Sequence, residues 1–446
     1  MEEKKILKGI TWAHSRGYTS IVAVSQRFME LNKDVEITWE KRSLQEFADA
    51  PIEELSKRYD LLIIDHPWAG FAAKHGILLP LQKYLSAEYL KDQEENSVGK
   101  SYISYDFDGF LSALPIDAAT PIAVYRPDYF ETTGEKVPET FEEVLELAKK
   151  GKVIYAGIPI NLLMDFYMFG ITAGYTMFNG EEVIGREDGC AVLEEMRRLS
   201  SLCTKEIFDW DPIAVHEALS SEEKYAYCPF AYGYTNYSKE GYAKHLLKAC
   251  DVVSYKGEHL HTVLGGTGLA VSAACENKET AVKFAEYAVS PLIQRTLFFE
   301  AGGQPGHRAA WLDEECNRRS LDFFKDTLRT LDESYLRPRY SGYLYFQERA
   351  GSYVREYLMN GGNPAEALEN MNTLYRKSME VDATSRCPPL GEPRQPHKVS
   401  RGTKTLGNLI LAGRHRVQRH AASRGTEALG NLSSPIRTRA LHYAAY

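Results

Sequence analysis

The sequence predicts an α/β protein, and three observations support that fold class. Extended and helical patterns alternate over the first 64 residues, and a similar alternation resumes at residue 113. A chain of 446 residues is long enough for two or three domains with separate cores. Its 44% hydrophobic and 26% charged residues are typical of a globular protein, and no apolar run is long enough to cross a bilayer. We therefore expect a mostly parallel sheet flanked by helices.

The first five elements alternate between strand and helix. Ile21, Val24 and Phe28 recur at helical spacing. Val35 and Ile37 alternate with polar residues, as in a half-buried strand. The pattern predicts strand, helix, strand, helix and strand at residues 6–12, 18–31, 35–42, 53–58 and 61–64.

The later elements are marked mainly by residues that start helices. Thr140 is an expected N-cap, and proline follows Ser290 and Asn363 at the first helical position. The pattern predicts two extended runs within 113–127, a helix from 141, strands at 153–159 and 265–274, helices opening at 277 and 290, and a last helix from 363 to about 376.

The end of the chain differs in composition from the rest. Residues 381–446 carry eleven Lys or Arg and three acidic residues, a formal charge of +8, whereas the first 380 residues carry −16. Four prolines fall within residues 388–396, and the only aromatic residues of this segment are Tyr443 and Tyr446, so we expect it to bury too little surface to offset its ordering entropy. We expect residues 380–446 to form a basic disordered tail, with a nucleic-acid-binding arm as the functional alternative. The acidic body itself is a poor binder of nucleic acid.

The seven cysteines show no metal-binding or redox spacing. They form no C-x-x-C pair and lie far apart, at positions 190, 203, 228, 250, 275, 316 and 387. Free buried thiols are the expected state of these residues. Such thiols are more typical of a reducing compartment than of an oxidising one.

Signatures of enzymes and metal sites are weak. The sequence lacks G-x-x-x-x-G-K-[ST] and G-x-S-x-G, and the glycines at 265, 266 and 268 precede a strand, which offers no helix dipole to a phosphate. His14, Asp65 and His66 are candidate metal ligands, as are His259 and His261, but no H-E-x-x-H motif or carboxylate-rich loop accompanies them. We expect no catalytic residue, no metal and no cofactor. An enzyme that uses His14 with Asp65 as an acid–base pair is the alternative.

Aromatic residues stand beside polar ones in four predicted loops. A flat ring can cover the apolar face of a sugar while neighbouring Asp, His, Arg or Asn side chains bind its hydroxyls. Ordinary core packing is the alternative for each single ring. Two of the loops follow predicted strands, which is where α/β sheets bind ligands. The clusters favour a cleft for a polyol, and they lie at residues 12–14, 66–68, 229–237 and 339–346.

Two long segments resemble the substrate-binding proteins of carbohydrate ABC transporters, the group similar to maltose-binding protein. Residues 114–150 resemble the first hinge crossing and the helix after it. Residues 265–311 resemble the return crossing, with a glycine-rich strand, two helices and a turn of glycine, glutamine and proline. The resemblance covers residues 6–379 and implies a type II periplasmic-binding-protein-like fold. Such a fold has two α/β lobes, joined by hinge strands, that close on a ligand.

The resemblance also implies lobe boundaries and ligand-facing residues. Lobe 1 is expected at 1–117 and 266–310, and lobe 2 at 118–265 and 311–379. Asp65 is expected to accept hydrogen bonds from ligand hydroxyls and Trp68 to stack on the ligand, whereas His66 is expected to be structural. The ligand-binding candidates carried over by position are His14, Arg16, Asp65, Trp68, Asp117, Tyr232, Tyr234, Gly266, Thr267, Tyr340 and Tyr343.

The function implied by the resemblance is non-catalytic capture of a sugar-like or other small polar ligand. The expected partners are that ligand and the permease subunits of an ABC importer, and the expected state is a monomer outside the cytoplasm, in the periplasm or at the cell surface. No export signal is visible in the chain, and the thiols are unusual for an exported protein. A cytosolic ligand-binding or sensor protein on the same fold is therefore the alternative. A protein that binds ferric ion through tyrosine ligands is a further, minor alternative.

Overall fold

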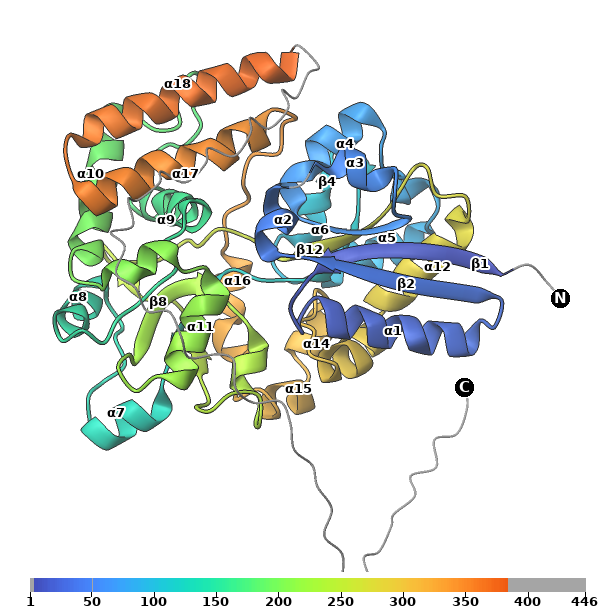
Figure 1. Ribbon diagram of the computed structural model, residues 1–446, viewed down its shortest axis with the longest axis horizontal. Coiled ribbons are helices and arrows are strands. Elements are labelled where there is room, and N and C mark those ends of the chain that lie inside the picture. Colours follow the sequence, from blue (N-terminus) through green and yellow to red (C-terminus); the bar gives the residue numbers. More distant parts are fainter. Residues whose placement is uncertain (1–3, 50, 384–446) are drawn as a thin grey trace, which may run out of the picture. The chain divides into compact units, whose positions relative to one another are not determined.

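The computed structural model describes residues 4–49 and 51–383 of the chain (Figure 1). The predicted basic tail falls almost entirely on residues 384–446, which lie outside the described residues. Within the described ranges, two separate hydrophobic cores form, each around its own main sheet. No helix in these ranges is both long enough and apolar enough to pass through a bilayer.

The first core surrounds a five-stranded sheet. Its strand order is β2 (Val35–Arg42), β1 (Lys5–Trp12), β3 (Leu61–Ile64), β12 (Thr267–Val271) and β6 (Leu114–Asp117). β1 runs parallel to β2 and β3, but β12 runs antiparallel to β3 and β6. The prediction of a mostly parallel sheet is therefore wrong for half of the strand pairs. The reason is non-local, because β12 enters the sheet from a segment about 200 residues after β3.

Helices α1 (Tyr18–Leu31) and α12 (Lys278–Val289) pack together and against this sheet (Figure 1). The apolar stripe predicted for the first of these helices is confirmed, because Ile21, Val24 and Phe28 are all buried. On the opposite side of β3, the chain continues through a 3₁₀ turn, η1 (His66–Trp68), into α4 (Ala69–His75).

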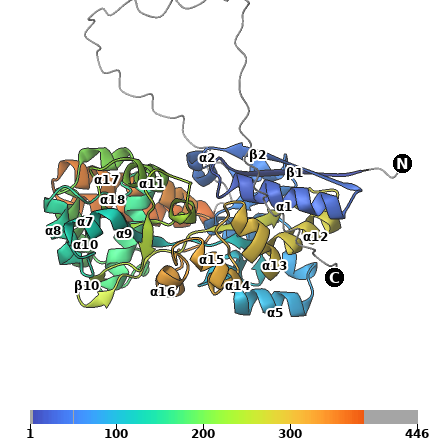
Figure 2. The same cartoon turned by 90° about the horizontal axis from the view of Figure 1, so that it is seen from below.

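The second core surrounds a three-stranded antiparallel sheet in the order β8 (Tyr227–Tyr232), β7 (Pro121–Tyr125) and β9 (Lys248–Cys250). Figure 2 shows helices of this core grouped apart from α1, α12 and α13 (Pro291–Ile293). The helices that pack in this core include α8 (Phe141–Lys149), α9 (Pro159–Thr172), α10 (Arg186–Ser200), α17 (Tyr343–Asn360) and α18 (Pro364–Ala383).

Two local predictions in this part have opposite outcomes. The Thr140 N-cap is confirmed, because its hydroxyl accepts from the Glu143 amide while the Glu143 carboxylate accepts from the Thr140 amide. The strand predicted at 153–159 does not form. Only Val153 makes a bridge, to Tyr227, and the amide of Gly157 bonds instead to the carbonyl oxygens of Ile207 and Trp210, in and just after the 3₁₀ helix η3 (Lys205–Asp209). The last helix continues to residue 383, beyond its predicted end.

Helix α17 fixes the position of the start of α9. The two helices pack along each other, and a Cβ atom at Gly351 would lie only 2.0 Å from the carbonyl oxygen of Pro159. A glycine is therefore required where α17 crosses the first turn of α9. This first turn, at residues 158–161, forms part of the cavity described below.

The chain crosses between the two sheets at residues 118–120 and returns at residues 264–266. The two crossings lie side by side, because Thr267 at the start of β12 pairs with Asp117 at the end of β6. Gly266 has a φ of 92°, and a Cβ atom there would lie 2.4 Å from the carbonyl oxygen of Asp117. Only glycine allows both this backbone conformation and this approach. The lobe boundaries expected from the sequence remain a prediction.

Candidate functional site

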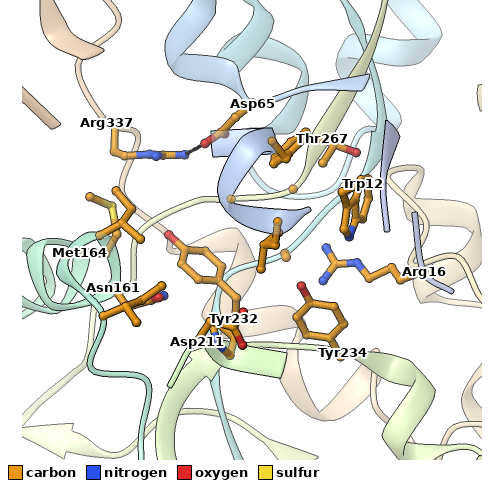
Figure 3. A pocket seen from close by; sticks show the side chains of 18 residues that line it. Trp12, Arg16, Asp65, Asn161, Met164, Asp211, Tyr232, Tyr234, Thr267 and Arg337 are labelled. Atoms are coloured by element: carbon orange, nitrogen blue, oxygen red, sulfur yellow. Dashed lines mark hydrogen bonds and ion pairs between the residues drawn. The ribbon is translucent and has the colours of Figure 1, made fainter. Parts of the chain in front are cut away.

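A cavity of about 180 Å³ lies beside these crossings (Figure 3). Its volume has room for about six water molecules, at their share of liquid volume. The loops after β1 and β3 contribute Arg16 and Asp65, and the return crossing contributes Gly266 and Thr267. Elements of the second core supply much of the remainder, including Asn161 and Met164 of α9 and Asp211, Tyr232, Tyr234 and Arg337.

The structure brings together part of the predicted binding set. The residues of that set that line the cavity are Arg16, Asp65, Tyr232, Tyr234, Gly266 and Thr267. They come from segments that are up to about 250 residues apart in the chain, so the fold alone makes them neighbours. In Figure 3 the hydroxyl of Tyr232 points toward the side of the cavity where Arg337 and Met164 lie. Burial raises the pKa of Tyr232, which keeps this hydroxyl neutral.

The remaining predicted residues lie elsewhere, and Trp68 is the clearest correction. Asp65 accepts from the amide of His66 and caps the η1 turn, which begins with Pro67. This turn directs Trp68 into the first core, where the ring is 6% exposed and meets Phe71 edge to face at 5.7 Å. Trp68 therefore does not line the cavity as a stacking platform. His66 is fully buried beside Asp65, as expected for a structural residue.

Tyr340 and Tyr343 are also absent from the cavity lining. The Tyr340 hydroxyl bonds to the hydroxyl of Ser378 in α18 at 2.6 Å. Tyr343 is fully buried in the second core, and its hydroxyl bonds to that of Tyr167 at 3.4 Å. The late aromatic segment therefore packs α17 against its neighbours. Arg337, just before this segment, does line the cavity, although the sequence did not predict it as a site residue.

His14 lies next to the cavity but not in its lining. Its Nδ1 accepts from the amide of Arg16, and its ring meets the edge of Tyr234 at 4.7 Å. Burial and the nearby Arg16 lower the pKa of His14 to about 4. Within the described residues, His14 and Asp65 share no hydrogen bond or ion pair, so the acid–base pair considered from the sequence does not form.

Arg16 joins three distant segments at one edge of the cavity. Its guanidinium donates from Nε and Nη2 to the two carboxylate oxygens of Asp117, at 2.7 and 2.5 Å, and from Nη1 to the carbonyl oxygen of Gly233 at 2.7 Å. Burial lowers the pKa of Arg16, but the Asp117 carboxylate outweighs burial and raises it above its ordinary value. Asp117 is 2% exposed and lies behind Arg16, so it holds the arginine and does not face the cavity.

A second ion pair joins the buried Arg337 to the partly buried Asp65. Nη2 of Arg337 donates to both carboxylate oxygens of Asp65 at 2.8 and 3.0 Å (Figure 3). Its Nη1 donates to Gln347 in α17 at 2.8 Å. Burial alone would raise the pKa of Asp65, but Arg337 and His66 outweigh burial and hold that pKa well below its usual range. Both arginine charges at the cavity are therefore already matched by carboxylates.

Four polar atoms around the cavity have no hydrogen-bond partner within the described part of the chain. Each is buried and belongs to a lining residue, and they are Trp12 Nε1, Asn161 Oδ1, Thr267 Oγ1 and Arg337 Nε. Buried polar groups in proteins are normally paired. The set contains two N–H donors, one carbonyl acceptor and one hydroxyl that can do both. The cavity can therefore satisfy a molecule that itself carries both donors and acceptors.

Of these four residues, only Thr267 was among the predicted ligand-binding residues, and Trp12 appeared only in the aromatic cluster at 12–14. Asn161 lies in an almost entirely buried helix whose neighbours are apolar, so its pattern indicates packing. Arg337 lies two residues before the predicted aromatic cluster at 339–346 and pairs with Asp65, 272 residues earlier in the chain. Among the described residues, no group of three or more His, Cys, Asp or Glu side chains could hold a metal ion.

Comparison with known structures shows the fold. A maltose-bound T. maritima MalE3 has a TM-score of 0.73 and 17% identity, covering 83% of this chain and 99% of that chain. A solute-binding protein of an ABC transporter from Agrobacterium radiobacter, in complex with ribitol, also has a TM-score of 0.73, with 19% identity over 84% of this chain and 99% of that one. These likenesses confirm the predicted periplasmic-binding-protein-like α/β fold.

Comparison of sequences gives the family. A maltotriose-binding protein of Pyrococcus abyssi is 28% identical over 128 residues, which are 29% of this chain and about a quarter, 26%, of that protein. Residues 23–309, more than half of the chain, match the family described as bacterial extracellular solute-binding protein. This range includes both crossings, β1's partner strands and most of the cavity lining. The chain therefore belongs to the bacterial extracellular solute-binding protein family.

Proposed function

We propose that the protein captures a hydroxylated, sugar-like ligand in this cavity and presents it to the permease of an ABC importer outside the cytoplasm. The observation that carries the proposal is the set of unpartnered polar atoms around the ring of Tyr232. Family membership supports it, and so do the ligands named for similar structures, which are maltose, ribitol and tagatose. Those structures also support a non-catalytic role and two lobes that close around the ligand.

The charges at the site favour a neutral ligand. Arg16 is held by the buried carboxylate of Asp117 and Arg337 by the partly buried carboxylate of Asp65, so neither offers an uncompensated charge to an acid. An anionic ligand in such a site would leave its own charge without a partner, which is costly, and Asp211, the remaining carboxylate of the lining, already accepts from the Ala214 amide as the N-cap of α11. A polyol needs only hydrogen-bond partners and an apolar face to lie on. Asn161, Thr267 and the Nε of Arg337 supply the first, and Tyr232 and Trp12 supply the second.

Replacing Thr267 with valine tests this proposal. Valine keeps the shape of threonine but removes the hydroxyl, so a ligand group bonded to that hydroxyl would be left unpaired at a cost of about 1–3 kcal/mol. We expect the dissociation constant to rise about tenfold or more. The free energy of unfolding should not fall, because the hydroxyl has no hydrogen-bond partner within the described residues.

The measurement begins with a thermal-shift screen of the full chain against monosaccharides, disaccharides and alditols. Calorimetric titration of the strongest hit then compares wild type with Thr267→Val. Thr133→Val is the matched control, because its exposed hydroxyl bonds to the carbonyl oxygen of Tyr129, away from the cavity. Equal affinity of wild type and Thr267→Val for the hit would contradict the assignment of this cavity. A screen without any carbohydrate or alditol hit would contradict the proposed function.

A further inference from the structure

Much of the cavity wall is aliphatic. The two ends of this wall come from different cores, with Leu44 of α2 (Leu44–Asp49) on one and residues at the starts of α9 and α11 (Pro212–Ser221) on the other. Leu44, Ile158 and Ile160 are only partly buried, so part of their surface is available to a ligand.

The aliphatic wall and the polar part of the cavity are formed by different residues. The polar atoms that lack partners belong to Trp12, Asn161, Thr267 and Arg337. Ile158, Ile160, Met164 and Pro212 offer no polar side-chain atom at all. Ile160 precedes Asn161 in the first turn of α9, so the polar and aliphatic parts of the cavity meet within that turn. A bound molecule therefore has two chemically different environments.

A simple sugar or alditol does not use both environments well. It carries a hydroxyl on nearly every carbon, and a hydroxyl that is buried against aliphatic side chains loses its water without gaining a partner. Tyr232 and Trp12 already provide rings that can cover the C–H face of a sugar. The additional aliphatic surface therefore fits a part of the ligand that has no hydroxyls.

We propose that the preferred ligand is a monosaccharide-sized glycoside with an apolar substituent, such as a methyl, isopropyl or phenyl aglycone. This inference rests on the proposed function and names the ligand class of the same site. The hydroxylated ring lies against the polar atoms near Asn161 and Thr267, and the aglycone lies against Ile160 and its aliphatic neighbours. The volume of about 180 Å³ has room for a single sugar ring with a small substituent.

Matched pairs of ligands test this inference on the full chain. Glucose, galactose, mannose and xylose are each titrated beside their methyl and phenyl glycosides by calorimetry. In at least one pair we expect the glycoside to bind about tenfold more tightly or better, because burying a few apolar carbons in a pocket is worth that much. Its binding heat capacity should also be more negative, since apolar surface is removed from water.

Ile160→Ser assigns the effect to the aliphatic wall. We expect this variant to lose most of the preference for the glycoside while its affinity for the parent sugar changes by less than about twofold. Ile171→Ser is the matched control, because Ile171 is a partly buried isoleucine on the same helix and does not line the cavity. It should keep the full preference of the wild type.

Each other outcome overturns a distinct claim. If parent sugars bind and no glycoside binds more tightly than its parent, the apolar substituent is wrong while the proposed function stands. If Ile160→Ser weakens both members of a pair equally, the assignment of the aglycone to this wall is wrong. If no sugar, glycoside or alditol binds at all, the proposed function fails, and this inference fails with it.

Discussion

Replacing Asp117 with alanine is expected to lower the free energy of unfolding by about 3–5 kcal/mol. The guanidinium of Arg16 and the carboxylate of Asp117 are 5% and 1% exposed, and two hydrogen bonds join them. Removing the carboxylate leaves a positive charge in the interior whose remaining partners are the Gly233 carbonyl oxygen and the face of the Tyr234 ring. Urea denaturation of the wild type and of Asp117→Ala measures the change.

The control for this prediction is a pair at the surface. Arg27 and Glu30 are 53% and 60% exposed, so Glu30→Ala should change the free energy of unfolding by less than about 1 kcal/mol. The double variant Arg16→Met/Asp117→Leu removes both charges and should recover a large part of the stability lost in Asp117→Ala. A loss below about 1 kcal/mol in Asp117→Ala would show that the interior charge finds another partner.

Acidification from pH 6.5 to pH 4 is expected to cost the wild type more stability than it costs His66→Gln or His216→Gln. Both histidines are fully buried. Burial lowers the pKa of each to about 4, with Arg337 adding to the effect at His66 and Arg16 at His216. In the unfolded chain a histidine takes up its proton near pH 6.5. Unfolding therefore takes up a proton at each site within this window.

The sign and the size follow from this proton uptake. Stability falls as the pH falls, because the unfolded state binds more protons, and each histidine contributes about 1.4 kcal/mol per pH unit until the loss is complete below pH 4. His14 acts in the same direction, whereas Asp117 and Asp165 act in the opposite one, because burial raises their pKa values. These groups are common to wild type and variants, and His216 is only the third cause of the low pKa of His14, after burial and Arg16, so the difference in slope reports mainly the removed histidine.

Urea denaturation at pH 6.5, 5.5 and 4.5 provides the measurement. Each single variant should show a slope of stability against pH that is shallower than the slope of the wild type by about one proton. A variant whose slope equals that of the wild type would mean that the removed histidine takes up its proton in the folded protein as readily as in the unfolded one.

The features that the sequence predicted correctly depend on nearby residues. The helix at 18–31 follows from an apolar stripe within it, and the start of α8 follows from Thr140 and Glu143, three residues apart. The strand expected at 153–159 failed because strand formation depends on distant partners, and the segment at 207–210 takes the backbone bond of Gly157. The antiparallel direction of β12 could not be predicted either, because it depends on pairing with β3, about 200 residues earlier in the chain.

The site shows the same division. A polar residue directly after a strand, such as Asp65, is placed near a ligand cleft by the sheet itself. The direction of the next ring depends on details of a single turn, and the η1 turn sends Trp68 into the core. Asn161 and Arg337 become site residues only through contacts between segments far apart in sequence, which no local pattern records.

Gly351 has a consequence for how selectivity could be altered. It lets α17 lie against the carbonyl oxygen of Pro159, directly before Ile160 and Asn161. A larger side chain at residue 351 would displace the first turn of α9 and change the shape of the binding cavity. It would do so without replacing any residue that contacts the ligand. Preference among guests can therefore evolve, or be engineered, from a backbone packing position remote from the recognition chemistry.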